Sequence, residues 1–161
     1  MPLSRQQLAL LGKLREEKHG YYKLAYTLTG SEREALEAVA RMTLKVAENI
    51  SALGEPEAFF AWSRQILVNA CRDFWHNRGG TLSMEEVSLA QGAGDIPIED
   101  ELILRQYIHQ LPQVHREILH LNFYLDYTYS DIAAILEIPE DTVNTCLQKA
   151  METLGEQMGE V

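Results

Sequence analysis

Residues 127–143 read YTYSDIAAILEIPEDTV, and two short amphipathic segments meet within this stretch. Thr128 or Ser130 can cap the first segment, because a hydroxyl at a helix N-terminus accepts a hydrogen bond from a backbone N–H of the first turn. Apolar residues at helical spacing follow on one face, namely Ile132, Ala133, Ile135 and Leu136. A tight turn is predicted at Glu137 and Ile138, and Pro139 then fixes the entry to a second helix.

The second segment reads as a longer amphipathic helix. Glu140 and Asp141 lie in its first turn, where the helix dipole favours acidic side chains. One face carries the apolar residues that are expected to pack on the first helix, namely Val143, Leu147, Ala150 and Leu154. The stretch therefore predicts a helix-turn-helix, a motif whose second helix enters the major groove of DNA.

The rest of the chain predicts further helices and no strand, so the fold class is all-α. Helices are expected over residues 3–19, 21–29, 31–50, 58–77, 99–110, 113–124, 129–136 and 140–158. Two inward-facing stripes are expected, Leu8, Leu10, Leu11 and Leu14 in the first helix and Leu36, Val39, Thr43 and Val46 in the third. Ser31 with Glu34 forms a capping-box pattern, and Gly79 with Gly80 is typical of a helix C-terminus.

Residues 79–98 contain four glycines, a proline and three acids with little periodicity, which predicts a flexible linker. The sequence thus predicts two small helical domains, 1–78 and 99–161, joined by 79–98. Charge is uneven along the chain: 1–78 carries 11 Lys/Arg and 9 Asp/Glu, and 99–161 carries 3 and 12. The predicted DNA-reading part is therefore the most acidic part of a chain of net charge −10.

Several classes of protein are disfavoured by composition. No apolar run approaches the roughly 20 residues that span a membrane, and the N-terminus lacks the apolar core of a signal peptide. Cys71 and Cys146 stand alone on predicted helices, so a reducing, cytoplasmic setting fits best. No cofactor motif, metal-ligand spacing or nucleophile pattern is present, which favours a protein that is not an enzyme.

Three blocks carry a resemblance to a known family. They are residues 111–143, with Leu111, Pro112 and the helix-turn-helix stretch; residues 22–45, beginning YKLAYTLTG; and residues 59–74, reading FFAWSRQILVNACRDF. The chain resembles bacterial RNA polymerase sigma factors of the extracytoplasmic-function type. The resemblance implies a clamp-binding and promoter-melting domain followed by a promoter-reading domain. It also implies core RNA polymerase, promoter DNA and an anti-sigma factor as partners.

In the 58–78 helix the resemblance and the residue types point to DNA. Arg64, Arg72 and Arg78 offer cations for phosphates, and Asn69 can hydrogen-bond a base edge. Helical spacing favours Phe60, Trp62 and Phe74 as core, whereas Trp75 faces elsewhere and is expected to be an exposed stacking residue. By resemblance, Asn69 and Arg72 would read promoter DNA near the start site.

The other predicted sites match the family less well. The resemblance places polymerase contacts on the 31–50 helix, at Glu34, Glu37 and Arg41. It places base contacts on the 140–158 helix, where the candidates are Thr142, Asn144, Thr145, Gln148 and Lys149. Lys149 is the single basic residue there, so this helix serves either DNA with polymerase supplying most phosphate contacts, or a protein partner.

Two functions follow. The first is a promoter-specificity subunit of RNA polymerase. The second is a sigma-like decoy that binds an anti-sigma factor or another protein and never DNA. The linker likewise has two interpretations, a segment threaded through polymerase or a solvated tether.

Overall fold

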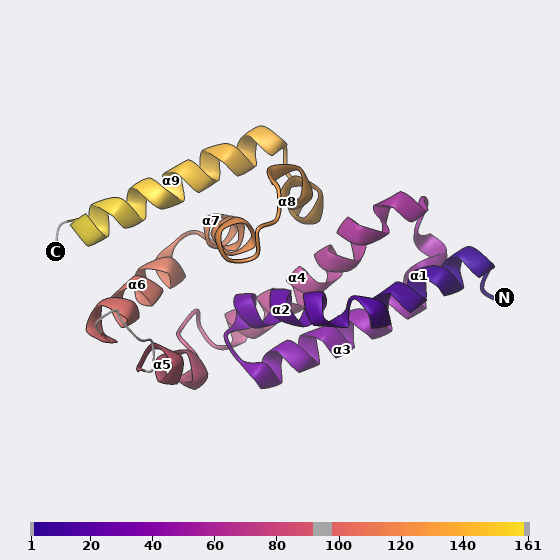
Figure 1. Ribbon diagram of the computed structural model, residues 1–161, viewed down its shortest axis with the longest axis horizontal. Coiled ribbons are helices and arrows are strands. Elements are labelled where there is room, and N and C mark those ends of the chain that lie inside the picture. Colours follow the sequence, from indigo (N-terminus) through magenta and orange to yellow (C-terminus); the bar gives the residue numbers. More distant parts are fainter. Residues whose placement is uncertain (1, 92–97, 160–161) are drawn as a thin grey trace. The chain divides into compact units, whose positions relative to one another are not determined.

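The computed structural model describes residues 2–91 and 98–159, and every regular element in those ranges is a helix (Figure 1). The chain divides into two compact units, Met1–Phe74 and Trp75–Val161. Helix α4 begins in the first unit, and its last turn, from Trp75, belongs to the second. Within the described residues no helix is both long enough and apolar enough to span a membrane.

The first unit contains α1 (Arg5–Glu16), α2 (Lys18–Thr29), α3 (Glu32–Asn49) and most of α4 (Phe59–Asn77). Two short 3₁₀ turns, Ile50–Ala52 and Pro56–Ala58, connect α3 to α4. Ser31 caps α3 as predicted, since its hydroxyl accepts a hydrogen bond from the backbone N–H of Glu34 at 3.3 Å. Gly30 ends α2 in the left-handed region, at φ 70°, where a residue without a Cβ is favoured.

The buried face of α3 differs from the predicted one. Leu36 is 55% exposed and Thr43 is exposed, so their predicted burial is wrong, although Val46 is buried. The buried residues are instead Ala35, Ala38, Met42 and Val46. Small alanine side chains let α2 and α3 pack closely, and the close approach turns the larger leucines outward. In α1, Leu10 and Leu14 are buried as predicted, whereas Leu8 is exposed.

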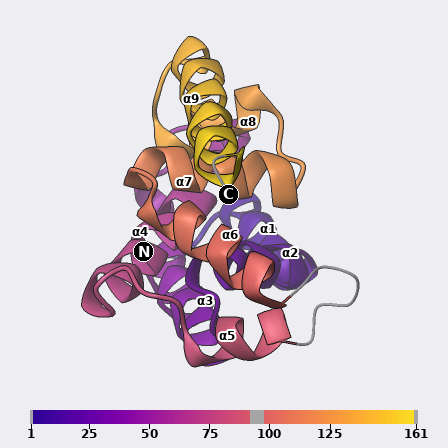
Figure 2. The same ribbon diagram turned by 90° about the vertical axis from the view of Figure 1, so that its left-hand side faces the viewer.

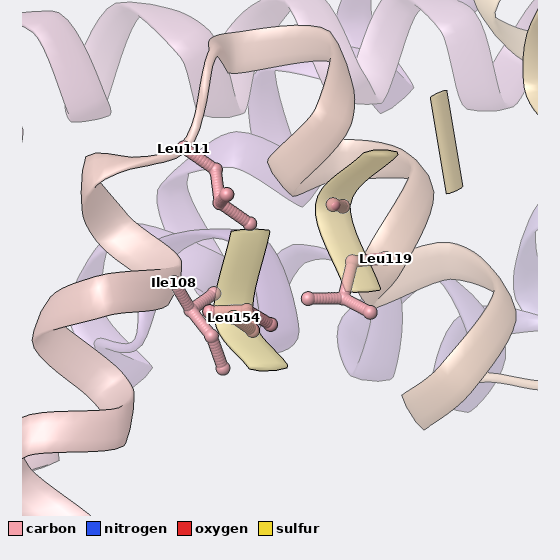
Figure 3. Packing of buried hydrophobic residues seen from close by; sticks show 5 residues of the cluster. Ile108, Leu111, Leu119 and Leu154 are labelled. Atoms are coloured by element: carbon pink, nitrogen blue, oxygen red, sulfur yellow. The ribbon is translucent and has the colours of Figure 1, made fainter. Parts of the chain in front are cut away.

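The second unit contains α5 (Met84–Gln91), α6 (Ile98–Gln110), α7 (Gln113–Leu119), a π-helical turn η3 (His120–Tyr124), α8 (Tyr129–Leu136) and α9 (Glu140–Gly159). Helix α9 packs on α6, α7 and α8, and Figure 2 looks along it. The core between α6, α7 and α9 is formed by Ile108, Leu111, Leu119, Ala150 and Leu154 (Figure 3).

Part of the predicted linker is helical. Residues 79–98 were expected to lack regular structure, but α5 forms within them because Ser83 and Glu86 cap each other. The backbone N–H of Glu86 donates to the Ser83 hydroxyl at 3.0 Å, and the N–H of Ser83 donates to the Glu86 carboxylate at 3.3 Å. The remaining predicted linker residues 92–97 lie outside the described residues.

Candidate nucleic-acid interface

The helix-turn-helix is built by local backbone chemistry. Thr128 caps α8, with its hydroxyl accepting a hydrogen bond from the Asp131 N–H at 3.0 Å. Glu137 then adopts the left-handed conformation, at φ 55°, and ends the helix. The N–H of Ile138 returns to the Ala133 carbonyl at 3.0 Å, and Pro139 leads into α9. The predicted order of cap, turn and second helix is confirmed.

Helix α9 has a buried apolar face and an exposed, mostly polar face. Val143, Ala150 and Leu154 are buried, which confirms the predicted inner face, and Leu147 is half-buried. The opposite face exposes four of the predicted base-contacting residues, Asn144, Thr145, Gln148 and Lys149, whereas Thr142 is half-buried. The Thr145 hydroxyl already donates to the Asp141 carbonyl at 3.0 Å.

Exposed acids surround these polar residues. Glu140, Asp141, Glu152 and Glu156 are all exposed on α9, against the single basic residue Lys149. Each of these carboxylates repels phosphate, so the counterion-release gain that normally drives DNA binding is small for this helix. The geometry of α9 suits binding in a major groove, but its negative charge opposes DNA binding.

Arg64 of α4 does not lie on a cationic surface. Its residue is 4% exposed, and the guanidinium carbon lies 3.8 Å from the centre of the Phe60 ring and 4.5 Å from that of Tyr21. The guanidinium also pairs with Glu17 at 3.7 Å. The predicted surface position of Arg64 is therefore wrong, because two aromatic faces and a carboxylate replace its hydration.

Trp75 is also buried, at 6% exposure, so the prediction of an exposed stacking residue is wrong. Its ring stacks on the His109 ring at 4.5 Å between centroids, and the Arg116 guanidinium lies 3.7 Å from the Trp75 ring centre. The Gly79–Gly80 turn, with both glycines at positive φ, closes over the same indole. Phe74 is buried as predicted, but the predicted burial of Phe60 is wrong, since it is 36% exposed, and Trp62 is only half-buried.

A buried carboxylate lies beside this indole cluster. Glu86 of α5 accepts a hydrogen bond from His109 at 2.9 Å and lies 3.8 Å from both Arg78 and Arg105. Burial opposes ionisation of Glu86, but the bond from His109 and the nearby positive charge hold its pKa below the usual value. The predicted cation Arg78 is thus already engaged, and its Nε also donates to the Thr81 carbonyl at 2.8 Å.

Comparisons with known proteins agree with this architecture. Residues 101–154 match the family "Sigma-70, region 4". The chain is 25% identical over 146 residues to RNA polymerase sigma factor SigV of Bacillus subtilis (strain 168), covering 89% of this chain and 87% of SigV. It is 24% identical over 158 residues to the ECF RNA polymerase sigma factor SigW of the same organism, and the match covers 88% of this chain and 84% of SigW.

Residues 101–154 thus match region 4 of the sigma-70 family, and the chain as a whole is similar to sigma factors of the extracytoplasmic-function group. The fold agrees with two solved structures. One is CnrH in complex with the cytosolic domain of CnrY, with a TM-score of 0.69, 15% identity, and coverage of 96% of this chain and 90% of that chain. The other is the sigma factor RpoE in complex with the anti-sigma factor NepR from Bartonella quintana. It has a TM-score of 0.60 and 19% identity, and the match covers 92% of this chain and 95% of that chain.

Two predicted DNA contacts of this chain lie on the outside of α4. Asn69 is exposed and Arg72 is half-buried, and the Arg72 guanidinium donates to the Asn69 side-chain oxygen at 3.2 Å. That bond holds the Asn69 amide with its N–H groups turned away from Arg72. The pair presents amide donors and a cation together, and its role at promoter DNA stays a prediction.

The predicted polymerase contacts on α3 differ in their exposure to solvent. Glu34 is buried behind the Ser31 cap, whereas Glu37 is exposed and pairs with Arg33 at 3.2 Å. Arg41 is exposed, with its guanidinium carbon 4.5 Å from the centre of the Phe74 ring. Leu36 and Leu44 add exposed apolar area, at 55% and 61%, to the same helix.

Sequence reasoning missed the cluster around Glu86. The available signal was Ser83 followed three residues later by Glu86, which is a capping-box pattern inside the supposed linker. Its partners Arg105 and His109 lie on a helix 19 or more positions away, so no local pattern predicts them. Among the described residues, no group of three His, Cys, Asp or Glu side chains is placed to bind a metal ion.

Proposed function

We propose that the chain directs core RNA polymerase to promoters by reading the upstream promoter element with α9 and the region near the start site with α4. The single observation that carries this proposal is the capped α8–α9 turn, which exposes Asn144, Thr145 and Gln148 together on the outer face of α9. Amide side chains at such positions can read adenine edges in a major groove. The proposed setting is the cytoplasm, where DNA and polymerase reside.

The exposed acidic residues on α9 determine how this helix can recognise promoter DNA. Free α9 binds DNA weakly, because Lys149 is opposed by four exposed acids. In the proposed complex, polymerase holds most of the phosphates and α9 contributes base recognition. The exposed face of α3, with Leu36, Glu37, Arg41 and Leu44, is the proposed polymerase surface. Glu34 is omitted from that surface because it is buried.

A protein regulator is also part of the proposal. The similar solved structures hold CnrH with the cytosolic domain of CnrY and RpoE with the anti-sigma factor NepR. In this chain, Phe123 is 63% exposed and Tyr124 is exposed beside it on the π-helical turn. Such a pair of exposed aromatic rings supports a covering partner of the anti-sigma class.

Transcription in vitro tests the proposal. Purified chain and bacterial core polymerase are incubated with fragmented genomic DNA, and the 5′ ends of the transcripts are sequenced. We expect a shared upstream element among the initiation sites. We also expect Gln148→Ala to weaken selection at that element, and Asn69→Ala to weaken selection near the start site. Gln106→Ala, an exposed glutamine on α6, is the matched control and should leave both unchanged.

The same experiment separates the sigma factor from a decoy. A decoy would bind a protein regulator but would direct no initiation with any core polymerase, and its DNA affinity would not depend on salt. Absence of promoter-specific transcripts, with correct folding shown by circular dichroism, would contradict the proposed function.

A further inference from the structure

A group of exposed basic residues lies on the first two helices of the first unit. The group consists of Arg5, Lys13, Arg15, Lys18 and Lys23, all of them exposed. Residues 5–23 contain these five basic residues and two acidic ones, Glu16 and Glu17, so the segment carries a charge of +3 in a chain of net charge −10. A local excess of positive charge on an acidic protein indicates a surface for an anionic partner.

Arg15, Lys18 and Lys23 share one side of α1 and α2. Glu17 alone separates the two helices, and backbone hydrogen bonds continue across it. Its N–H donates to the carbonyl four residues before it at 2.8 Å, and its carbonyl accepts from the N–H four residues after it at 3.1 Å. The helical register is therefore kept, so the residues three and eight positions after Arg15 lie on its side. The opposite side of α2 is buried and includes Tyr21, Leu24, Ala25 and Leu28.

We call Arg15, Lys18 and Lys23 the cationic stripe, and its charges are not compensated by neighbouring groups. None of the three side chains forms an ion pair or a hydrogen bond with another described residue. The adjacent acid Glu17 pairs instead with the buried Arg64 at 3.7 Å, which leaves Glu16 as the exposed acid beside the stripe. By contrast, every arginine from Arg33 onward contacts a carboxylate, an amide oxygen or an aromatic ring.

A row of uncompensated cations attracts phosphates, because its binding releases counterions from DNA. We propose that the cationic stripe binds the phosphate backbone of duplex DNA. The inference rests on the proposed promoter function and adds a contact to it, since the stripe supplies phosphate contacts from the first unit while Lys149 is the single basic residue of α9. Contacts of this kind position a protein on DNA and do not select its sequence.

The stripe suits a duplex better than a single strand. From Arg15 to Lys23 the helices rise by about 12 Å, a length over which duplex DNA presents several phosphates. A single strand is normally held by exposed aromatic rings on which its bases stack. Tyr22 and Tyr26 lie on the same side, but both are half-buried and their rings stack on each other at 6.0 Å between centroids. Phosphate contacts alone favour the duplex, because its charge density is higher.

Binding of the full chain to a labelled duplex of mixed sequence, without polymerase and over a range of salt concentrations, tests the inference. Lys18→Gln combined with Lys23→Gln removes two cations and keeps helix propensity. We expect an affinity about tenfold lower at low salt, and a slope of log K against log salt that is shallower by about 1.8.

The matched control is Lys13→Gln combined with Lys45→Gln, which makes the same change in net charge at two exposed lysines. Lys13 lies about 200° round α1 from Arg15, and Lys45 lies on α3. We expect the control to change the slope by less than about 0.5.

A variant of the opposite sense keeps the test independent of folding. Glu16→Gln removes the exposed acid beside the stripe, and we expect the affinity for duplex DNA to rise about threefold at low salt. Glu48→Gln, at an exposed site on α3, makes the same change in net charge and should have little effect. If the double lysine variant loses helical content by circular dichroism, the comparison of these two glutamate variants decides the inference.

The inference is overturned if the original chain shows no salt-dependent binding to the duplex, if the folded double lysine variant keeps the original slope, if the control pair lowers the slope equally, or if the two glutamate variants respond alike. A single strand of the same length is measured in parallel, and tighter binding of that strand overturns the assignment to duplex DNA. Transcription with core polymerase is scored separately. A chain that binds duplex through the stripe but starts no promoter-specific transcripts refutes the proposed function alone, and the reverse result refutes this site alone.

Discussion

Helices α4 and α9 were both predicted to meet DNA, and the structure treats their polar residues in opposite ways. On α4 the cation Arg64 turns inward and lies against the rings of Tyr21 and Phe60, and directly after the helix Arg78 pairs with Glu86. On α9 the predicted contacts stay exposed, but carboxylates surround them. An arginine on an amphipathic helix is therefore not automatically a surface charge, because aromatic faces can replace water around a guanidinium.

The largest effect is expected at Arg64, where α4 is fixed to α2. Arg64→Ala removes two cation–π contacts, the hydrogen bond to the Phe60 carbonyl at 3.2 Å and the pair with Glu17. We expect the free energy of unfolding to fall by about 3 kcal/mol, measured by urea denaturation with circular dichroism. Arg33→Ala, which breaks an exposed pair with Glu37, should cost less than about 0.5 kcal/mol. Similar costs for the two variants would mean that Arg64 is a surface charge after all.

The second effect concerns pH and the unit that supports α9. Burial, with positive charge from His109 and Arg116, lowers the pKa of His120 from 6.5 to about 3. As the pH falls below 6.5, His120 therefore takes up a proton in the unfolded chain but stays neutral in the folded chain. Stability is fully present above pH 6.5 and falls as the pH drops toward 3, by about 2 kcal/mol between pH 7 and pH 5.

Urea denaturation at several pH values measures this dependence. His120→Leu should flatten the slope between pH 7 and pH 5, because leucine takes up no proton in either state. Glu86 does not confuse the measurement, since its lowered pKa places its titration below this window. His19→Gln, at an exposed histidine, should leave the slope unchanged. A slope that survives His120→Leu would assign the pH dependence to another group.

The sequence predicted most of the helices because their signals are local. Thr128, Glu137 and Pro139 specify the α8–α9 turn by capping and backbone preference, so residue types within a few positions were enough. The buried faces were harder. Leu36 was expected inside α3, but the fit of Ala35 and Ala38 against α2 rotates it outward, and that fit depends on a neighbouring helix.

The predictions for the candidate site were wrong where contacts between residues far apart in the sequence determine whether a side chain is buried. Trp75 was expected outside because it follows a buried phenylalanine, but His109 and Arg116 cover it. Neither partner has a sequence pattern that points to Trp75. By contrast, Asn144, Gln148 and Lys149 are exposed as expected, because the periodicity of α9 alone separates the two faces of the helix.

The smallest effect is expected from changing the charge of α9, which tests whether its carboxylates limit DNA binding. Glu152→Lys replaces an exposed carboxylate by a cation on this helix, and we expect the DNA affinity of the free chain to rise by about fivefold at low salt. The slope of log K against log salt should steepen by about 0.9 if the new lysine contacts one phosphate. Glu48→Lys, at an exposed site on α3, makes the same change in net charge and should have little effect on the slope. Equal responses would show that overall charge, and not the face of α9, limits DNA binding; the contrast between α4 and α9 would then be one of total charge alone.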